Sequence, residues 1–395
     1  MAGDLIDIAT ARELVLAAVR PLGSERVPVS EALGRVLAED LSAEEDLPPF
    51  DSSAMDGYAV IAGPEGQLEV VDESRAGHPA QRALAGGQAI EISTGALIPE
   101  GADAVVPVER VEVSDGRVTV PQTQPGANVR HAGDDVRRGQ PVLSAGTLLG
   151  PAELAVAASL GHSALPVGLR PRVVVLATGD ELVEPGLPLG PGQIRNSNTI
   201  ALAAQAASAG ADVVDTEIVR DTLDDTTALL RAALESADVV CVSGGVSVGP
   251  HDHVKPALAE LGVEERFWRV ALKPGKPTWF GTRDGKLVFG LPGNPVSAMV
   301  TFHLFARPAI RALQGAPPGA ERATAVLDEP VRLNPRREQA LRVRLEADGD
   351  GWHATTTGDQ GSHVLTSMLG ARALALIPTG EGELAAGERV EVELL

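Results

Sequence analysis

Glycine and serine residues follow an apolar run in residues 239–249, VVCVSGGVSVG. The apolar run predicts a strand buried in a sheet, and the glycines and serines predict a turn that faces a ligand. Hydroxyls that donate hydrogen bonds, and glycines that allow close backbone approach, suit a phosphate or a pterin-like polar ligand. The residues concerned are Ser243, Gly244, Gly245 and Ser247. A tight strand-to-helix turn without a ligand is the structural alternative.

A second candidate site lies in residues 286–297, KLVFGLPGNPVS, which predict a strand, a short loop and a helix. Asn294 suits the N-cap of that helix and Pro295 suits its first position. The amino terminus of a helix attracts negative charge, so this loop, with Pro292 and Gly293, predicts an anion site shared with the glycine-serine turn.

Charged residues accompany these turns. Asp180 and Glu181 end the apolar run 173–181, VVVLATGDE, where carboxylates could hold a divalent cation or a ribose hydroxyl. Lys273 and Lys276 lie in KPGKP, where the prolines restrict the backbone and favour positioned phosphate partners. A solvated acidic turn and ordinary surface lysines are the alternatives.

Other acids and histidines give weaker signals. Asp56 in SAMDGYA and Asp135 in AGDD are ordinary loop acids by local sequence. His251 and His253 have no third histidine at metal-binding spacing, so surface histidines are the favoured interpretation. The chain contains no Walker lysine loop or GxGxxG fingerprint, which argues against P-loop and simple nicotinamide chemistry.

The elements that must position these residues alternate between strand and helix from residue 172 to residue 315. Such alternation predicts a doubly wound parallel sheet with right-handed crossovers. Because parallel strands point the same way, the loops TGDE, SGGVSVG and GLPGNP must line its carboxyl edge, where open α/β sheets bind ligands.

The remaining chain predicts three further domains around this α/β domain, residues 171–315. Helical patterns assign residues 1–44 and 143–170 to a linking subdomain, with Asp7 or Thr10 capping its first helix. Short alternating runs assign residues 45–142 to an antiparallel β domain, and residues 316–395 to a small β-barrel-like domain. Within residues 45–142, Asp115-Gly116 suits a type I′ hairpin turn that pairs Val111 and Val113 with Val118 and Val120. Asn196 or Asn198 is expected to cap a helix of the α/β domain.

Composition limits the class of protein. At 395 residues the chain exceeds the ~100–200 residues usual for one domain. No apolar run approaches the ~20 residues needed to cross a bilayer and the start is acidic, so we expect no membrane span and no signal peptide. The single cysteine, Cys241, lies in an apolar strand and fits a cytoplasmic protein. A net charge of −21 and 3% aromatic residues argue against nucleic-acid binding.

Ordered motifs over essentially the whole chain resemble the molybdopterin molybdenumtransferases, the family that includes the gephyrin E domain. The motifs are PPFDSSAMDGYAV, STGALIPEGADAVVPVE, ATGDELVEPG, GQIRNSN, SGGVSVGPHD, LKPGKP, GLPGNPVSA and QGSHVLTSMLG. The resemblance implies a magnesium-dependent transferase of molybdenum cofactor biosynthesis. Such an enzyme inserts molybdate into the dithiolene of adenylylated molybdopterin and releases AMP. It also implies a homodimer, and the enzyme that adenylylates molybdopterin is a candidate partner.

By motif, the resemblance assigns active-site roles to Asp56, Thr94, Asp135, Glu181 and Asp252. It assigns Lys273, Lys276, Pro292 and Pro295 to the frame of the pterin or molybdate pocket, and Ser362 to the same site. Asp180 and Glu181 are the expected Mg²⁺ ligands. Pro250-His251 departs from the family pattern, in which an acidic residue is common after VSVG.

Two other functions remain to be weighed. A nucleotide pyrophosphatase or nicotinamide-nucleotide deamidase can share the α/β domain, but such an enzyme lacks the SAMDGYA region. A non-enzymatic scaffold is the third interpretation, because gephyrin also clusters receptors. We expect no flanking module or long linker of the kind that role would need.

Overall fold

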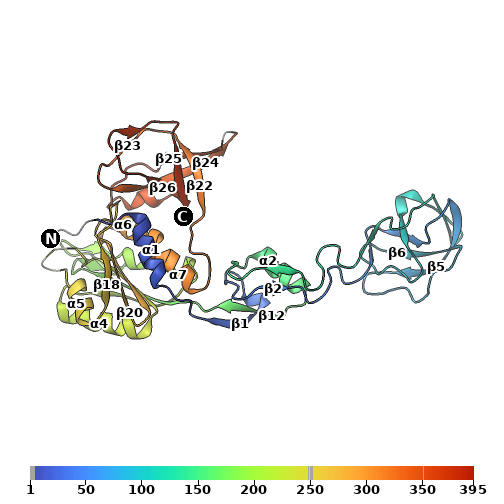
Figure 1. The fold of residues 1–395 in the computed structure, drawn as a ribbon, viewed down its shortest axis with the longest axis horizontal. Helices are drawn as coiled ribbons and strands as arrows, with labels where there is room; N and C mark the ends of the chain where they lie inside the picture. Colours follow the sequence, from blue (N-terminus) through green and yellow to red (C-terminus); the bar gives the residue numbers. More distant parts are fainter. Residues whose placement is uncertain (1–4, 248, 250–251, 350) are drawn as a thin grey trace. The chain divides into compact units, whose positions relative to one another are not determined.

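The computed structural model describes residues 5–247, 249, 252–349 and 351–395. The chain forms two compact units (Figure 1). The first unit comprises Met1–Arg26, Gly34–Ala38 and Pro166–Leu395, and the second comprises Val27–Leu33 and Glu39–Leu165. Among the described residues, none of the helices has both the length and the apolar character that a membrane span requires.

A six-stranded sheet forms the centre of the first unit, in the order β16-β13-β17-β21-β20-β18. The first four strands in this order run parallel, and β20 and β18 are antiparallel to their neighbours. The strands are β13 (Arg172–Thr178), β16 (Asp212–Val219), β17 (Val239–Ser243), β18 (Glu264–Trp268), β20 (Trp279–Arg283) and β21 (Lys286–Leu291). The chain leaves β13 for β16 on one side and returns to β17 on the other, so a crevice opens at the carboxyl ends of β13 and β17.

Helices cover both faces of this sheet. They are α1 (Ile8–Ala18), α3 (Asn198–Ser208), α4 (Leu223–Ser236), α5 (Val254–Glu260), α6 (Pro295–Thr301), the π-helical η3 (Phe302–Ala306) and α7 (Arg307–Leu313). Alternate strand residues point to opposite faces, so Val173 and Val175 pack with α3 and η3 while Val174 and Leu176 pack with α4 and α5. This confirms the predicted doubly wound α/β domain.

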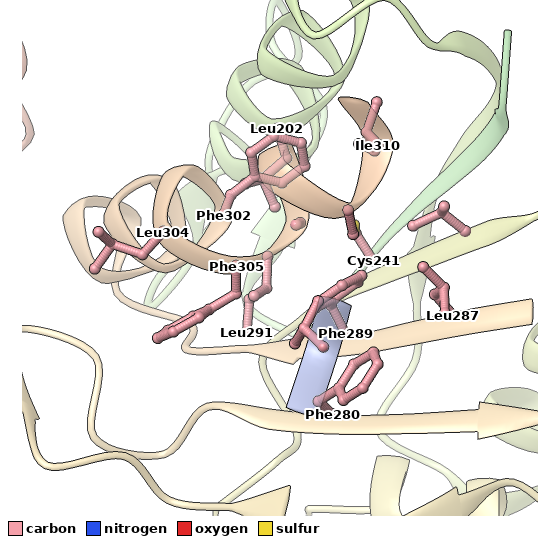
Figure 2. Close-up of a cluster of buried hydrophobic side chains, with 14 of the residues drawn as sticks. Leu202, Cys241, Phe280, Leu287, Phe289, Leu291, Phe302, Leu304, Phe305 and Ile310 are labelled. Atoms are coloured by element: carbon pink, nitrogen blue, oxygen red, sulfur yellow. The ribbon is translucent and has the colours of Figure 1, made fainter. Parts of the chain in front are cut away.

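Aromatic side chains fill the larger of these two core clusters. Figure 2 shows Phe280 and Phe289 from the sheet together with Phe302 and Phe305 from the covering helix. The rings of Phe280 and Phe289 lie 4.9 Å apart at 34°. Cys241 is fully buried in the same cluster, and burial raises the pKa of its thiol to about 12. The cysteine is therefore an inert core residue, as the sequence predicts.

The amino-terminal helix α1 belongs to this core. Asp7 caps it by accepting a hydrogen bond from the backbone N–H of Thr10 at 2.7 Å. Its buried residues Ile8, Ala11 and Val15 join the larger core cluster. The sequence pattern had placed this helix in the linking subdomain, because an apolar stripe shows that a helix buries one face but not which sheet it meets.

A small β-barrel forms the carboxyl-terminal part of the first unit and confirms the predicted small β domain. The pairing order β24-β25-β22-β28-β26 closes because β26 also pairs with β24. These strands are β22 (Arg322–Leu327), β24 (Glu338–Asp348), β25 (Gly351–Thr356), β26 (Ala373–Ile377) and β28 (Arg389–Leu394). The short strand β19 (Leu272–Lys273) adds in parallel to β24, and β23 (Val331–Arg332) pairs with β27 (Glu383–Leu384).

A buried carboxylate joins the barrel to α1. Glu393 accepts two hydrogen bonds of 2.6 Å from Arg12 and a contact of 2.9 Å from Arg322. Burial raises the pKa of Glu393, but these arginines hold it below its usual value. His303 lies 3.8 Å from the same carboxylate, yet burial and the charge of Arg307 lower the pKa of His303 to about 4. His303 is therefore neutral at pH 7, and this contact is not an ion pair.

The second unit contains another six-stranded sheet, in the order β7-β4-β6-β5-β9-β8. Its strands are β4 (Gly57–Val60), β5 (Gly66–Ser74), β6 (Gln88–Ile92), β7 (Ala104–Pro107), β8 (Glu112–Ser114) and β9 (Arg117–Val120). All neighbours are antiparallel except β5 and β6. The predicted hairpin is confirmed: Val113 faces Val118, and Asp115 and Gly116 have φ of 51° and 72°, as a type I′ turn requires.

Short strand pairs precede and follow this sheet. β1 (Ser24–Pro28) pairs with β12 (Ala164–Gly168), β2 (Leu41–Ser42) with β11 (Pro141–Leu143), and β3 (Ser52–Ser53) with β10 (Val129–Arg130). The helical parts are α2 (Pro151–Ser159), η1 (Val29–Glu31) and η2 (Val108–Arg110). The α2 helix begins as predicted at Pro151, and Glu153 accepts the backbone N–H of Gly150 at 2.9 Å.

Candidate active site

The glycines after β17 pack against the protein itself. Gly244 and Gly245 have φ of 94° and 67°, which favour glycine. An added Cβ would lie 2.7 Å from Thr178 Oγ1 at Gly244 and 2.7 Å from Val254 Cγ2 at Gly245. From the sequence, these glycines were expected to leave room for a ligand. The structure gives a different reason, because the turn must fit over the end of β13 and the start of α5.

The turn is also anchored on its far side. Val246 is buried, and its carbonyl accepts a hydrogen bond of 3.1 Å from the indole N–H of Trp268. Lys255 Nζ lies 3.1 Å from the centre of the Trp268 ring, and the Arg269 guanidinium lies 3.9 Å from it. These contacts fix residues 244–246 before any ligand binds.

Two adjoining cavities open at the carboxyl ends of β13 and β17. The smaller has a volume of about 330 Å³ and the larger about 590 Å³. They share the wall residues Thr178, Glu181, Pro277, Pro292 and Gly293. The smaller cavity is also lined by Gly244, Gly245, Ser247 and Asp252, and the larger by Ser243, Asn294 and Pro295. Most of the site residues predicted from the three loops therefore line these two cavities.

Three carboxylates line the smaller cavity: Glu181, Asp221 and Asp252. An added Cβ at Gly179 would lie 2.5 and 2.6 Å from the two Glu181 carboxylate oxygens. The Glu181 carboxylate therefore lies directly against the backbone of Gly179, where only glycine leaves room for it. Within the described parts of the chain, no group donates a hydrogen bond to the Glu181 carboxylate. An acidic rim of this kind repels an anionic ligand unless a cation lies between them.

Backbone N–H groups hold the other two carboxylates. Asp252 accepts a short hydrogen bond from the N–H of Gly249. Asp180 and Asp221 are paired, because each carboxylate accepts the backbone N–H of the other at 3.3 Å. Asp180 does not line either cavity, so its carboxylate positions Asp221. No cluster of three or more metal-ligating side chains is formed by the residues that the structure describes.

A hydrogen-bond network forms one wall of the larger cavity. Ser243 Oγ donates to the carbonyl of Pro292 at 3.1 Å. Asn198 Nδ2 donates to Ser243 Oγ and to the carbonyl of Gly293, both at 2.8 Å. Asn198 is the first residue of α3 and Ser197 is its N-cap, while Asn196 accepts the backbone N–H of Thr199 at 3.3 Å. Asn196 therefore supports the helix start, and Asn198 joins three loops of the site.

The barrel supplies a further part of this wall. Asn294 is the N-cap residue of α6, as predicted, but its side-chain amide is hydrogen-bonded to Ser362 Oγ at 2.9 Å instead of capping the helix. His363 lines the larger cavity. The loop before them is held by Arg342, which donates to the carbonyls of Asp359 and Gly361 at 3.4 and 3.3 Å. Burial lowers the pKa of the Arg342 guanidinium to about 10, which leaves it charged at pH 7.

Neither lysine of KPGKP lines these two cavities, although both are close in sequence to a residue that does. Lys273 and Lys276 are both exposed, and it is Pro277 that lines both cavities. Their role as phosphate partners stays a prediction. Pro250-His251, the departure from the family pattern, lies outside the described residues, and so does Val248 of the SGGVSVG loop.

Asp56, Thr94 and Asp135 lie in the second unit. Asp56 and Thr94 are brought together, because the Asp56 carboxylate accepts the backbone N–H of Thr94 at 2.8 Å. Asp135 is exposed, and its backbone N–H bonds to the carbonyl of Leu47 at 3.0 Å. None of the three lines the cavity of about 310 Å³ in this unit, which is lined by residues 60–66, 68, 86–87, 120–121 and 123.

Several cavity residues were not singled out from the sequence. Asp221 lies just after β16 and could have been found, because it follows a strand of the same sheet as Glu181 does. Asn198 was considered only as a helix cap. The remaining missed wall residues are Thr178, Gly179, Leu182, Ile194, Arg195, Ser197, Val246, Gly249, Pro277 and His363.

Three family models match the chain in succession. The MoeA N-terminal region (domain I and II) matches residues 6–161, the probable molybdopterin binding domain matches residues 174–312, and the MoeA C-terminal region (domain IV) matches residues 324–395. The carboxyl-edge cavities thus lie mainly in the second of these regions, and Ser362 and His363 in the third.

Similar proteins are known over nearly the whole length. A molybdopterin molybdenumtransferase from Haemophilus influenzae is 37% identical over 94% of both chains. Molybdopterin molybdenumtransferase 2 from Mycobacterium tuberculosis is 40% identical over 96% of both chains. The crystal structure of the molybdopterin biosynthesis MoeA protein from Pyrococcus horikosii is 34% identical, with a TM-score of 0.83 over 99% of both chains.

Proposed function

Since this chain belongs to the molybdopterin molybdenumtransferase family, we propose that it inserts molybdate into the dithiolene of adenylylated molybdopterin and releases AMP. The observation that carries this proposal is the pair of adjoining cavities at the carboxyl edge of the sheet. The smaller has three carboxylates on its rim, whereas the larger combines Glu181 and Arg195 with the neutral polar side chains of Asn198, Ser243 and Asn294. A substrate with a charged phosphate end and a neutral heterocyclic end has the matching chemistry.

Mg²⁺ fits the acidic rim by the chemistry of its donors. Mg²⁺ usually takes one or two protein carboxylates together with substrate phosphates, and it does not need an all-protein cage. Glu181 offers a carboxylate to which no described group donates, and Asp221 and Asp252 lie on the same cavity. Bound there, Mg²⁺ would neutralise charge on the phosphoanhydride and so favour departure of AMP. Asp180 would act by holding Asp221 in place.

The chain's own residues bind and orient the substrate. Ser247 and the turn at Gly244 and Gly245 face the phosphate end, and Ser243, Asn294 and Ser362 face the heterocycle. Pro292 and Gly293 form walls of both cavities and Pro295 a wall of the larger one, which limits the freedom that the bound substrate would otherwise keep. Lys273 and Lys276, although outside the two cavities, are proposed to attract the anionic substrate or molybdate.

We propose that the enzyme is a homodimer in which Asp56, Thr94 and Asp135 of one subunit serve the carboxyl-edge cavities of the other. The N–H of Thr94 fixes the direction of the Asp56 carboxylate, so this acid is positioned although it is exposed. The cytoplasm is the proposed location. The enzyme that adenylylates molybdopterin is the proposed donor of the substrate.

The test is to incubate the protein with adenylylated molybdopterin, Mg²⁺ and molybdate, and to follow AMP release and activation of a cofactor-free molybdoenzyme. AMP release that requires both Mg²⁺ and molybdate, and that activates the molybdoenzyme, is expected. AMP release without molybdate would favour the pyrophosphatase alternative, and no turnover with retained binding would favour a scaffold.

A further inference from the structure

Asn198 lines the larger cavity, and its neighbours fix the direction of its side-chain amide. Its Nδ2 lies 2.8 Å from the carbonyl of Gly293 and 2.8 Å from Ser243 Oγ. A backbone carbonyl can only accept a hydrogen bond, so the amide nitrogen must be the atom that faces Gly293. The usual ambiguity between the oxygen and the nitrogen of an asparagine side chain is therefore resolved here.

Ser243 confirms the same direction independently. Its hydroxyl has one hydrogen, which it donates to the carbonyl of Pro292 at 3.1 Å. Toward Asn198 it can then act only as an acceptor. Both hydrogens of the Asn198 amide are thus used, one by Ser243 and one by Gly293. Asn294 is different, because its partner Ser362 is a hydroxyl that can either donate or accept, so its amide direction is not fixed.

The other end of the amide, Asn198 Oδ1, remains available. No residue in the described ranges donates a hydrogen bond to it, and it is not among the buried atoms that lack a partner. An accessible, neutral acceptor on a cavity wall selects a ligand group that carries an N–H or O–H. It disfavours phosphate oxygens, which are themselves acceptors.

We propose that Asn198 Oδ1 accepts a hydrogen bond from the 2-amino or N3–H group of the pterin ring, and so helps the larger cavity to select that ring. This inference rests on the proposed function, because it assumes a pterin substrate. It assigns the ring to the larger cavity and the phosphate end to the acidic one. It also explains the hydrogen bonds among Asn198, Ser243, Pro292 and Gly293, because they orient Asn198 Oδ1 toward the ligand.

The test is a double-mutant cycle between protein and ligand, measured by titration calorimetry. The probes are 6-hydroxymethylpterin phosphate, its analogue without the 2-amino group, and its N3-methyl derivative. One neutral hydrogen bond contributes about 0.5–1.5 kcal/mol, so Asn198→Ala should bind the parent probe about 3- to 10-fold more weakly. One of the two analogues lacks the N–H group that donates to Asn198 Oδ1. That analogue should bind to the wild type and to Asn198→Ala with equal affinity, because the hydrogen bond is already missing.

Gln205→Ala is the matched control. Gln205 lies on the same helix and its amide donates to the carbonyl of Met299 at 3.3 Å, but it lines neither cavity. This variant should bind all three probes as the wild type does. If Asn198→Ala does not fold, Asn198→Ser is taken through the same cycle, because it also removes the amide oxygen.

Two results would overturn the inference alone: unchanged binding of all probes by Asn198→Ala, or an equal loss for all three probes, which would mean a purely structural role. Failure of the wild type to bind both the parent probe and molybdopterin itself would instead contradict the proposed function, and the inference with it.

Discussion

The two units place their candidate residues in contrasting ways. In the first unit, the residues lie at the ends of buried strands and are held by side-chain hydrogen bonds around two cavities. In the second unit, Asp56, Thr94 and Asp135 lie on exposed loops and line no described cavity. This contrast fits the proposal that the first region binds the ligand and that the second presents an acid to it. Substitutions in the two regions should therefore change different kinetic quantities.

The largest effect is expected for Asp56→Asn. Its side chain is exposed, so folding and pterin binding should change little. The amide oxygen can still accept the N–H of Thr94, whereas the charge is lost. Removal of a positioned acid typically lowers turnover by roughly 100-fold or more. Molybdate-dependent AMP release and titration calorimetry on the same sample measure the two quantities. Turnover equal to that of the wild type would remove Asp56 from the site.

Glu181→Gln should lower turnover by roughly 100-fold, which is the lower limit of the loss expected for Asp56→Asn. It should also change the dependence of turnover on Mg²⁺. The substitution removes a charged oxygen ligand without changing the shape of the cavity. Binding should remain, and a higher Mg²⁺ concentration should recover part of the activity. AMP release measured across a Mg²⁺ series gives the answer. An unchanged Mg²⁺ profile would place the metal elsewhere.

Gly293→Val should act on binding, with affinity for adenylylated molybdopterin falling roughly 10- to 100-fold. An added Cβ at Gly293 meets only Gly244 Cα within 4 Å, at 3.7 Å, and the position lines both cavities. The backbone therefore tolerates the side chain, which fills the cavity. Gly245→Val is a poorer test, because its Cβ would clash with Val254 and Thr178.

Gly319→Val is the control for this substitution. No atom lies within 4 Å of an added Cβ there, and the residue lines neither cavity. Calorimetry on both variants should show weaker binding only for Gly293→Val. Normal affinity in Gly293→Val would mean that the ligand does not occupy the shared wall of the two cavities.

The last effect concerns stability in acid instead of activity or binding, and it should appear in the first unit alone. Burial and Arg307 hold the folded-state pKa of His303 at about 4, below its ordinary value of 6.5. The folded chain therefore binds this proton less tightly than the unfolded chain does. The full contribution to stability is present above pH 6.5, and it is lost as the pH falls from 6.5 toward 4. The loss is on the order of 3 kcal/mol.

His303→Gln should remove this pH dependence, because glutamine does not titrate. All three tryptophans, Trp268, Trp279 and Trp352, lie in the first unit, so their fluorescence reports its unfolding specifically. Urea unfolding at pH 7 and pH 5 measures the difference for both proteins. Equal stability of the wild type at the two pH values would contradict the lowered pKa of His303 in the folded chain.

The comparison also explains how far the sequence could predict the molecule. Parallel strands fix where their carboxyl ends meet, so Ser243, Glu181 and Pro292 could be placed at one edge from the strand pattern alone. Side-chain direction could not be predicted in this way. Asn294 bonds to Ser362 instead of capping α6, and Asn198 leaves the cap to Ser197 and faces the cavity. Both depend on residues that are far away in the chain.

The exposed loops were the opposite case. Nothing in the local sequence distinguished Asp56 from an ordinary loop acid, and only the resemblance of whole motifs to the family singled it out. The structure adds the bond from Thr94, which is a contact across 38 positions of the chain. Helix α1 shows the same limit, because its apolar stripe did not reveal that it packs on the α/β sheet.

The central claim is that Asp56 of one subunit acts at the carboxyl-edge cavities of the other, and mixing two inactive variants tests it most directly. Asp56→Asn and Glu181→Gln are unfolded together in equal amounts and refolded, and AMP release is measured alongside the oligomeric state. Random pairing gives mixed dimers in about half of the molecules, each with one intact site, so activity should recover to about a quarter of the wild-type value. Mixed dimers that form but show no recovery would contradict the claim.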